Sequence, residues 1–405
     1  MPSFAKHMRG LSRIVELKHH KYDVLIAVPI TSTYKKTYNL RHVVLFAGLI
    51  ALAIANFVVL VKAFRREPPP GPPYNPLDHY QFLNRNPLID SAAPSLSLTT
   101  PQHEGEYAVV TALYTDAFAP AVATLGHSLQ KVQTSAKLLM FYIPGQISPS
   151  ALCLATSSGF TPRPMRRIPP PNDGKDVHEH FLDQFTKLGV WTLDQEGIKS
   201  VVYLDADTLV SKNFDELFTL PFNFGAVPDV YLDDKAFTLG FNAGVLFLRT
   251  STKTFDNMIA KLEMAKFPHW EAEQSYLNHF FGAEAVRLPY AYNGNLAIKR
   301  RARKLWNGTQ MNRRIIHFTL VKPFLNETYG VVPFDELEER IEEVAEHWDG
   351  DFREEVWWWG DMFQEMKNTY GERIRYCRTE MDPDEYLWKR PNVTIATTSV
   401  RGWWH

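Results

Sequence analysis

The sequence predicts an α/β fold in which helices flank a mostly parallel β-sheet. Between residues 107 and 204, segments with strand-like and helix-like patterns alternate, and turn-forming residues separate them. The last of these segments, residues 201–204, is apolar throughout, which is typical of a strand buried on both faces. Alternation of this kind indicates βαβ units. We therefore expect a functional site at the carboxyl ends of the strands, where open α/β sheets bind ligands.

The individual elements follow from local patterns. Strands are expected over residues 107–113 and 137–143, with a helix between them whose apolar residues recur at helical spacing. The other expected elements are a helix at 177–196, strands at 201–204, 223–229, 243–248 and 314–318, and helices at 252–264 and 271–281. This order places the turn after residue 113 and the turn after residue 204 on the same rim of the sheet.

Two carboxylates, Asp205 and Asp207, follow the apolar strand directly. Two aspartates separated by one small residue can present oxygens to one divalent cation, and such hard ligands suit Mg²⁺ or Mn²⁺. A metal there would neutralise the diphosphate that leaves during transfer from a nucleotide sugar. An acidic pair after a strand can also cap a helix or face water, so this motif needs support from the rest of the chain.

Two residues far along the chain can supply that support. His317, near the end of an expected strand, can complete a metal site as a neutral imidazole, and Lys322 can reach a phosphate from a tight turn. A histidine at a strand end is also often a hydrogen-bonded structural residue. The two interpretations remain open at this point.

The amino-terminal third predicts a membrane anchor followed by a spacer. Residues 43–61 are uncharged, and Asn56 is their only polar residue. The length of this segment suits a bilayer span, and a buried core helix is the alternative. Basic residues are more numerous before this segment, so residues 1–42 are expected to be a cytoplasmic tail and the rest luminal. Residues 62–104 are rich in proline and are expected to form an extended stem.

Composition excludes one class of partner and leaves the cysteines undecided. The formal net charge is −1 across 405 residues, and the central region has no basic stripe interleaved with aromatic residues, so we expect no nucleic-acid partner. Cys153 and Cys377 are too few for a disulfide scaffold and fit no zinc spacing. They can form one long-range disulfide or remain as two buried thiols.

The carboxyl-terminal region, residues 331–405, is expected to be a helical, tryptophan-rich appendage that ends in a tail. Acidic helical segments alternate with Trp348 and with the run of three tryptophans at 357–359. These side chains can pack the appendage onto the sheet domain, or they can form a platform that stacks on the sugar rings of an acceptor.

An ordered series of motifs extends over most of the central region. The residues that carry it are Thr186, Lys187, Leu188 and Trp191; residues 203–210; Asn213, Asp215, Leu217 and Phe218; residues 241–245; Glu273, Gln274, Leu277 and Asn278; Leu288, Pro289, Tyr292 and Asn293; and His317, Phe318, Val321, Lys322 and Pro323. In this order the series resembles glycosyltransferase family 8, the family of glycogenin and of galactinol- and glucuronic-acid-transferring enzymes. The resemblance implies a GT-A fold, that of nucleotide-diphospho-sugar transferases, with a catalytic domain at residues 105–330.

The resemblance also implies a set of site residues. Asp205, Asp207 and His317 would bind Mn²⁺, with Mg²⁺ as the alternative, and Lys322 would hold the phosphates. Lys187 would contact a phosphate or the donor sugar, while Asn242, Glu273 and Gln274 would line the sugar pocket and supply the catalytic groups. Residues 110–115 would run alongside the uracil and ribose. The residues that would bind the nucleotide are Thr111, Ala112, Leu113, Thr115 and Phe118, together with Ala206, which lies between the two aspartates.

The chain departs from the family pattern at several of these positions. The aromatic residue expected to stack on the base is Phe118, the usual Asn-Ser-Gly is Asn242-Ala243-Gly244, and the usual Asp-Gln is Glu273-Gln274. These departures affect the identity of the donor sugar more than the fold. Retention of anomeric configuration is implied, with Glu273 or Gln274 steadying an oxocarbenium-like transition state or acting briefly as nucleophile.

The function predicted from the sequence is transfer of a sugar, with retention, from a UDP-sugar to a glycan or glycoprotein acceptor. The expected location is the Golgi membrane as a single-pass type II protein, with the endoplasmic reticulum as the alternative. One rival is a phosphohydrolase that uses Asp205 as its nucleophile. A second rival is a catalytically inactive, membrane-tethered glycan-binding protein.

Overall fold

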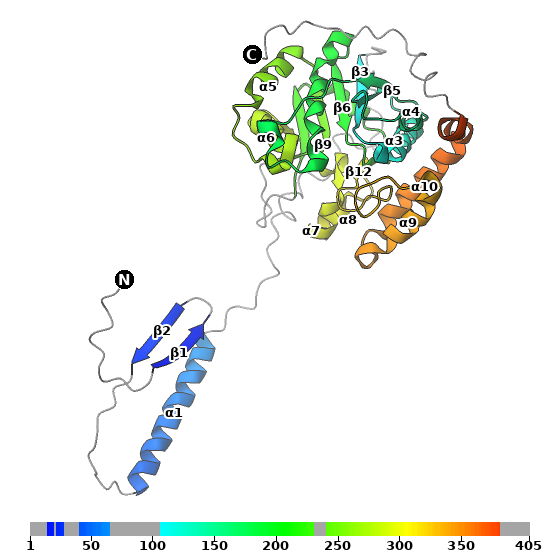
Figure 1. The fold of residues 1–405 in the computed structure, drawn as a ribbon. Coiled ribbons are helices and arrows are strands. Elements are labelled where there is room, and N and C mark those ends of the chain that lie inside the picture. Colours follow the sequence, from blue (N-terminus) through cyan, green and yellow to red (C-terminus); the bar gives the residue numbers. More distant parts are fainter. Residues whose placement is uncertain (1–13, 20–21, 28–39, 65–105, 231–239, 381–405) are drawn as a thin grey trace, which may run out of the picture. The chain divides into compact units, whose positions relative to one another are not determined.

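The computed structural model describes residues 14–19, 22–27, 40–64, 106–230 and 240–380, which fall in two compact units (Figure 1). The first unit, Met1–Tyr74, contains an antiparallel pair of strands, β1 (Ile14–His19) and β2 (Tyr22–Ala27), and one helix, α1 (Leu40–Phe64). The second unit, Asn75–His405, contains the predicted catalytic domain. Most of the predicted stem and the carboxyl-terminal tail from residue 381 lie outside the described residues.

The structure contradicts the prediction of a transmembrane helix at residues 43–61. Among the residues that the structure describes, no helix combines the length and the apolar character that crossing a membrane requires. The same finding overturns the predicted single-pass placement in the Golgi membrane.

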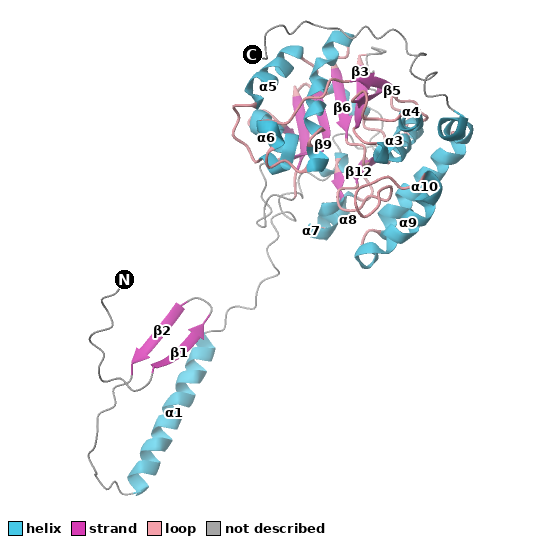
Figure 2. Ribbon diagram, in the orientation of Figure 1, coloured by secondary structure: helices cyan, strands magenta, loops and turns pink. Residues whose placement is uncertain are grey.

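A seven-stranded sheet forms the centre of the second unit, as Figure 2 shows. Its strand order is β10-β8-β9-β6-β3-β4-β5, with bounds β3 Tyr107–Leu113, β4 Lys137–Tyr142, β5 Thr161–Pro164, β6 Ser200–Leu204, β8 Phe224–Pro228, β9 Phe241–Arg249 and β10 Val286–Arg287. Every neighbouring pair is parallel except those that include β9, which runs antiparallel to both β6 and β8. The predicted mostly parallel α/β sheet is therefore confirmed.

Apolar side chains cover both faces of this sheet because the strands alternate their side chains between two cores. In β6, Val202 and Leu204 belong to one core, while Val201 and Tyr203 belong to the other. The first core includes α3 (Ala119–Lys131) and α4 (Pro149–Ala155), and the second includes residues of α5 (Thr252–Leu262) and α6 (Ala272–Phe281). All five residues of β6 are buried, as its continuous apolar pattern predicts.

The segment expected as a helix over residues 177–196 has a tighter winding in the structure. It forms a short 3₁₀ turn at Glu179–Phe181 and a longer 3₁₀ segment at Gln184–Glu196. Thr192 donates its hydroxyl to the Gly189 carbonyl at 2.8 Å. Such local side-chain bonds compete with the α-helical pattern. The 3₁₀ segment nevertheless buries the predicted apolar residues Phe185, Leu188 and Trp191.

The second unit also contains a smaller sheet of three strands. Its order is β11 (Gly294–Asn295), β12 (Ile315–His317) and β7 (Thr208–Val210). Strand β7 begins one residue after Asp207 and pairs antiparallel with β12, with Thr208 opposite His317. This pairing joins two segments that are about a hundred residues apart in the chain.

The carboxyl-terminal helices pack onto the second unit through buried contacts. They are α9 (Leu337–Glu346), α10 (Arg353–Thr369) and α11 (Gly371–Arg375), and they follow α7 (Leu296–Arg301) and α8 (Arg303–Thr309). Lys299 of α7 forms a buried ion pair with Glu355 of α10, at 2.6 Å. Cys153 of α4 is disulfide-bonded to Cys377, which settles the alternatives that the sequence left open.

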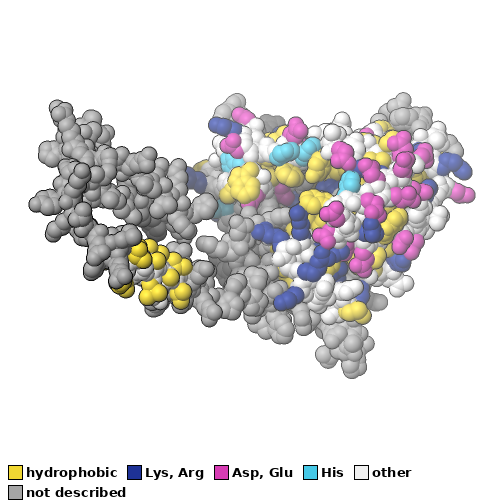
Figure 3. All heavy atoms as spheres, turned by 90° about the horizontal axis from the view of Figure 1, so that it is seen from below, with side chains coloured by type: hydrophobic (Ala, Val, Ile, Leu, Met, Phe, Trp, Pro, Cys, Tyr) yellow, Lys and Arg dark blue, Asp and Glu magenta, His cyan; other side chains and the backbone are white. Residues whose placement is uncertain are grey.

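The tryptophans of this region differ in exposure. Trp359 is 1% exposed and its ring lies 5.5 Å from the ring of Phe324 in the loop after β12, so it packs the appendage onto the core. Trp348 and Trp357 are 48% and 41% exposed. The face shown in Figure 3 mixes acidic and basic side chains with hydrophobic ones.

Candidate functional site

The predicted site residues converge on one edge of the large sheet because the strand directions bring them there. The parallel strands β3 and β6 both end at this edge, followed by Tyr114 and Asp205. Strand β9 runs the opposite way, so its beginning, with Asn242, lies at the same edge. The Asp205 amide donates to the Gly244 carbonyl at 2.8 Å, which fixes the turn after β6 against β9.

The small sheet delivers His317 to the two aspartates. Because Thr208 pairs with His317, the residue before Thr208 lies beside the residue after His317, and the Phe318 amide donates to the Asp207 carbonyl at 2.9 Å. His317 Nε2 lies 3.2 Å from Asp207 Oδ1 and 4.0 Å from Asp205 Oδ2. The structure thus brings the three predicted metal ligands together.

This cluster has the geometry and the chemistry of a divalent metal site. One ligand atom from each of Asp205, Asp207 and His317 lies within 4.8 Å of the others. Ligands about 2.1 Å from one ion are separated by about 3 to 4 Å, so a small movement would complete the site. Two carboxylates with one imidazole suit Mn²⁺ or Mg²⁺ better than a soft metal, and the residues present therefore fit the implied cofactor.

Each aspartate directs one oxygen to a lysine and the other to His317. Asp205 Oδ1 lies 3.0 Å from Lys187 Nζ, and Asp207 Oδ2 accepts a hydrogen bond from Lys322 Nζ. Burial disfavours the charge of Asp207, but Lys322 and His317 outweigh burial and hold its pKa well below the usual range. Asp207 is therefore ionised, as a metal ligand must be.

Two neighbours fix the orientation of the His317 ring. The Nδ1 atom of His317 lies 3.3 Å from Asn293 Oδ1, and donation of its proton there leaves the Nε2 lone pair directed to the aspartates. The ring also lies directly against Gly244, because a Cβ added at that position would be 2.1 Å from His317 Cε1. No side chain larger than hydrogen fits at position 244 without moving the imidazole.

Lys187 is the buried cation of the site. It is 1% exposed and its Nζ lies 2.6 Å from Glu273 Oε1 and 3.3 Å from the Ala243 carbonyl. Burial disfavours its charge, but Asp205 and Glu273 more than compensate and raise its pKa above the usual range. Burial also raises the pKa of Glu273, which Lys187 opposes. Lys187 therefore remains a fixed positive charge beside Asp205.

Two of the predicted sugar-pocket residues, Asn242 and Gln274, belong to one hydrogen-bonded chain. Gln274 Oε1 accepts from Asn242 Nδ2 at 3.2 Å and from the Ala243 amide at 3.0 Å, while Gln274 Nε2 donates to Asp229 Oδ2 at 2.9 Å. Asn242 Oδ1 in turn accepts from Asn293 Nδ2 at 2.8 Å. Because Asn293 also contacts His317, the chain connects the sugar-pocket residues to the metal ligands.

The segment after β3 lies at the same edge, with one residue that sequence reasoning missed. Thr111, Ala112 and Leu113 are buried within β3, Thr115 is exposed, and Phe118 packs edge-on against Phe324 at 5.1 Å. Tyr114 belongs to the 110–115 segment expected beside the nucleotide, but it was not singled out as a site residue. Its hydroxyl is buried and has no hydrogen-bond partner among the residues that the structure describes. Burial, and to a smaller extent Tyr203, raises its pKa. An unpaired buried hydroxyl beside Lys187 and Asp205 is suited to a ligand contact.

Three further residues complete the site and were also not predicted to contribute to it. Asn293 orients His317, Asp229 holds Gln274, and Gly244 makes room for the imidazole. The only signal in the sequence was indirect, because Asn293 and Gly244 belong to the motif series and Asp229 ends an expected strand. Their roles depend on contacts between distant segments, which no local pattern specifies.

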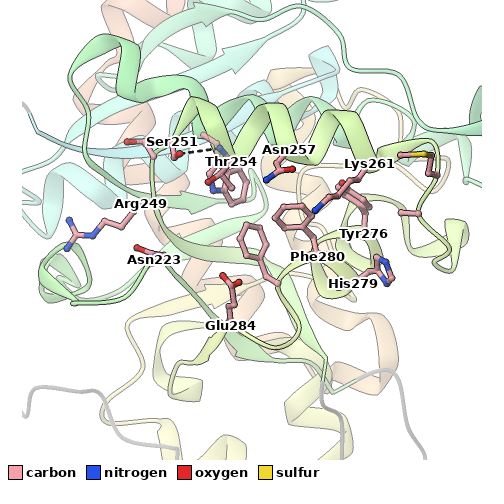
Figure 4. Close-up of a pocket in the computed structure, with 15 residues that line it drawn as sticks. Asn223, Arg249, Ser251, Thr254, Asn257, Lys261, Tyr276, His279, Phe280 and Glu284 are labelled. Carbon is pink, nitrogen blue, oxygen red and sulfur yellow. Dashed lines mark hydrogen bonds between the residues drawn. The ribbon is translucent and has the colours of Figure 1, made fainter. Parts of the chain in front are cut away.

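A separate pocket of about 710 Å³ lies between α5 and α6 (Figure 4). It is lined by Arg249, at the end of β9, and by Asn257, Lys261 and His279 among others. Gly244 and Arg249 are five residues apart on one strand, so this pocket lies about 16 Å along the sheet from the metal cluster. None of the predicted site residues lines it.

The fold and the site together define the class of protein. An Asp-x-Asp turn at the carboxyl end of a buried strand, with an imidazole and two lysines around it, is suited to binding a metal and a diphosphate. Residues 178–328 match the family model described as "Glycosyl transferase family 8". The resemblance to glycosyltransferase family 8 that the motif series predicted is therefore confirmed over residues 178–328.

Individual relatives agree with this assignment. The chain is 28% identical to glycogenin of Neurospora crassa over 245 residues, which are 58% of this chain and 34% of that protein. It is 30% identical to glycogenin-1 of Homo sapiens over 199 residues (46% and 53%) and 25% identical to galactinol synthase 4 of Arabidopsis thaliana over 211 residues (45% and 62%). The chain thus spans about a third of the Neurospora protein and about half of the human one.

Among solved structures, the chain is similar to the glycosyltransferase GlyE of Streptococcus pneumoniae TIGR4. The identity is 19%, the TM-score is 0.42, and the alignment covers 66% of this chain and 64% of that one. A similarity at this level carries no argument about the site.

Proposed function

We propose that this chain is a retaining glycosyltransferase with a GT-A catalytic domain at residues 105–330 and a helical appendage at 331–405. Its donor is a UDP-sugar, its cofactor Mn²⁺ or Mg²⁺, and its acceptor a glycan or glycoprotein. The observation that carries the proposal is the convergence of Asp205, Asp207 and His317, with Lys187 and Lys322 on either side.

The charges of the site match those of a nucleoside diphosphate. When bound, the metal supplies positive charge that stabilises the departing diphosphate. Lys322 donates to Asp207 and to the Phe318 carbonyl, so its ammonium lies where it can also contact the phosphates. Lys187 is buried at the opposite side of the aspartates, where it orients Asp205 and faces a phosphate or the donor sugar. Both lysines act by position and charge, because neither needs to lose a proton.

Asn242, Glu273 and Gln274 form the sugar-binding part of the site. The amide of Gln274 is held at both ends, by Asn242 and the Ala243 amide on one side and by Asp229 on the other. Side chains held in this way keep their geometry as charge develops on the anomeric carbon, which favours a transition state with oxocarbenium character. The nucleotide binds at the end of β3 and the segment that follows it. The contacts there come from the Tyr114 hydroxyl and from Thr111, Ala112, Leu113, Thr115 and Phe118.

The experiment that tests this function is a donor screen by release of UDP. The full-length chain should release UDP from at least one of UDP-glucose, UDP-galactose, UDP-N-acetylglucosamine and UDP-glucuronic acid when Mn²⁺ is present. Loss of a charge-stabilising ligand in Asp207→Asn should lower the rate by at least about 100-fold. The exposed residue Asp256 on α5 provides the matched control, because Asp256→Asn removes the same charge away from the site.

Two results would contradict the proposal. Release of UDP from none of these donors would exclude UDP-sugar chemistry, and an Asp207→Asn variant as active as the parent would exclude the metal site. Hydrolysis of p-nitrophenyl phosphate that depends on Asp205, without UDP release, would instead support the phosphohydrolase.

A further inference from the structure

A small groove lies where the carboxyl-terminal helices meet the loop that follows His317. Its volume is about 180 Å³. Its lining includes Leu320, Lys322, Tyr329, Arg340, His347 and Trp348. The first three belong to the loop after β12, and the others come from α9 and the turn that follows it. The appendage therefore forms one wall of this groove.

The groove adjoins the proposed donor site through one side chain. Lys322 lines the groove and also donates to Asp207, so one side chain belongs to both. On the other side, the ring of Tyr329 lies 5.0 Å from the ring of His180, in the segment that leads to Lys187. A ligand in the groove would therefore lie beside Lys322.

Two aromatic side chains of the groove are exposed and have an unusual backbone conformation. Tyr329 is 53% exposed and Trp348 is 48% exposed. Both have positive φ angles, 61° and 57°, in the left-handed region that bulky residues rarely adopt. Backbone strain of this kind is retained where a side chain must be presented in a fixed direction. Arg300 lies over one face of the Trp348 ring, at 4.3 Å, and supports that orientation.

The two cationic side chains of the groove have partners within the chain. Arg340 donates to the Leu325 carbonyl at 2.8 Å and to the carboxylates of Glu327 and Glu343 at 3.0 and 2.7 Å. Lys322 is paired with Asp207. Arg340 thus ties the loop to α9, and its single charge is shared between two carboxylates. One ligand atom from each of Glu327, Glu343 and His347 lies within 4.8 Å of the others, so these groups stay polar beside the groove. The two exposed aromatic rings are the part of the groove that favours a neutral ligand.

From these observations we propose that the groove binds a neutral sugar ring of the acceptor, with Tyr329 and Trp348 as its platform. Aromatic faces beside hydrogen-bonding groups suit a carbohydrate, which presents both apolar C–H faces and hydroxyl groups. The position next to Lys322 would place the acceptor beside the departing diphosphate. This inference rests on the proposed function and gives the carboxyl-terminal appendage a role in acceptor binding.

The test is a direct binding titration that requires neither donor nor turnover. The full-length chain is titrated with linear trisaccharides of glucose, of galactose and of mannose, and binding is followed by tryptophan fluorescence and by calorimetry. Tyr329→Asn and Trp348→Asn remove each ring, and asparagine tolerates the positive φ at both positions. Each substitution should weaken binding about tenfold, and Tyr329→Phe, which retains the ring, should restore it.

Two controls make the result decisive. Trp357→Ala removes another exposed tryptophan of the appendage that does not line the groove, and binding should be unchanged. Asn257→Ala alters the separate pocket between α5 and α6. Binding of none of the trisaccharides by the parent chain would overturn the inference. So would a loss of binding in Asn257→Ala while the two groove variants bind normally.

Kinetics then separate this inference from the proposed function. If the chain transfers sugar to a trisaccharide, Trp348→Asn should raise KM for the acceptor more than it lowers kcat. Equal KM values in parent and variant would contradict acceptor binding in the groove and would not affect the proposed donor site. Absence of UDP release would contradict the proposed function, and the binding titration would still test whether the groove binds a sugar.

Discussion

Replacing Gly244 with alanine should disturb the metal site through a single methyl group. The added Cβ would lie 2.1 Å from His317 Cε1, 2.6 Å from Nδ1 and 2.9 Å from Nε2. Ordinary carbon contacts are about 3.5 to 4.0 Å, so the ring must move by about 1.5 Å. His317 Nε2 now lies 3.2 Å from Asp207 Oδ1, and a displacement of that size removes it from the position where a shared ion could be bound.

The expected effect is a weaker metal site in a chain that still folds. Misplacing one ligand should lower the affinity for Mn²⁺ by about 10- to 100-fold, the range seen when the groups that orient metal ligands are removed. Overpacking of this kind should cost about 1–3 kcal/mol of stability. The assay is calorimetric titration with Mn²⁺ in the presence of UDP, with thermal unfolding measured in parallel.

Gly371→Ala provides the matched control for this prediction. Its added Cβ would have no neighbouring atom within 4 Å, so affinity and stability should both stay close to those of the parent. A Gly244→Ala chain that binds Mn²⁺ as tightly as the parent would refute the assignment of His317 as a ligand. If the Gly244→Ala chain fails to fold, His317→Gln, which removes the imidazole without adding an atom at position 244, takes its place in the same comparison.

Three further predictions concern stability. Lys299→Ala leaves the buried Glu355 carboxylate unpaired and should cost about 3–5 kcal/mol in chemical denaturation, whereas a loss under about 1 kcal/mol would show that the pair does not anchor α10. Removing the Cys153–Cys377 disulfide, which closes a separation of 224 residues, should cost about 2–4 kcal/mol, and equal midpoints with and without reductant would contradict this. Burial lowers the pKa of His127 in the folded chain, and Glu365 opposes this shift only in part. Because protonation of His127 therefore favours the unfolded chain, the free energy of unfolding should fall as the pH drops below about 6.5. The fall should be less steep in His127→Gln.

The large sheet could be predicted because its strands carry local signals. The apolar run of β6 and the patterns of β3 and β4 predicted their positions to within a residue or so, and the Asp-x-Asp turn followed from its place after β6. The meeting of Asp207 with His317 could not be derived from local patterns, because it depends on pairing between β7 and β12. Only the ordered motif series, by resemblance, placed them in one site.

Other parts of the site and fold depended on contacts that a sequence pattern does not encode. The part of Asn293 in orienting His317 and that of Asp229 in holding Gln274 arise from side chains of separate loops. The 3₁₀ winding of residues 184–196 differs from the α-helix that the apolar spacing predicts, and a local bond from Thr192 to the Gly189 carbonyl accompanies it. The anchor at residues 43–61 was predicted from hydropathy alone, and the structure contradicts it within the residues that it describes.

The central claim is that one divalent ion is bound by Asp205, Asp207 and His317. Pulsed electron paramagnetic resonance of the Mn²⁺-loaded chain with UDP tests it most directly, because a histidine ligand produces a nitrogen hyperfine coupling on the metal. We predict that coupling in the parent and its loss in His317→Gln. A spectrum without nitrogen coupling in the parent, or one that His317→Gln leaves unchanged, would contradict the claim.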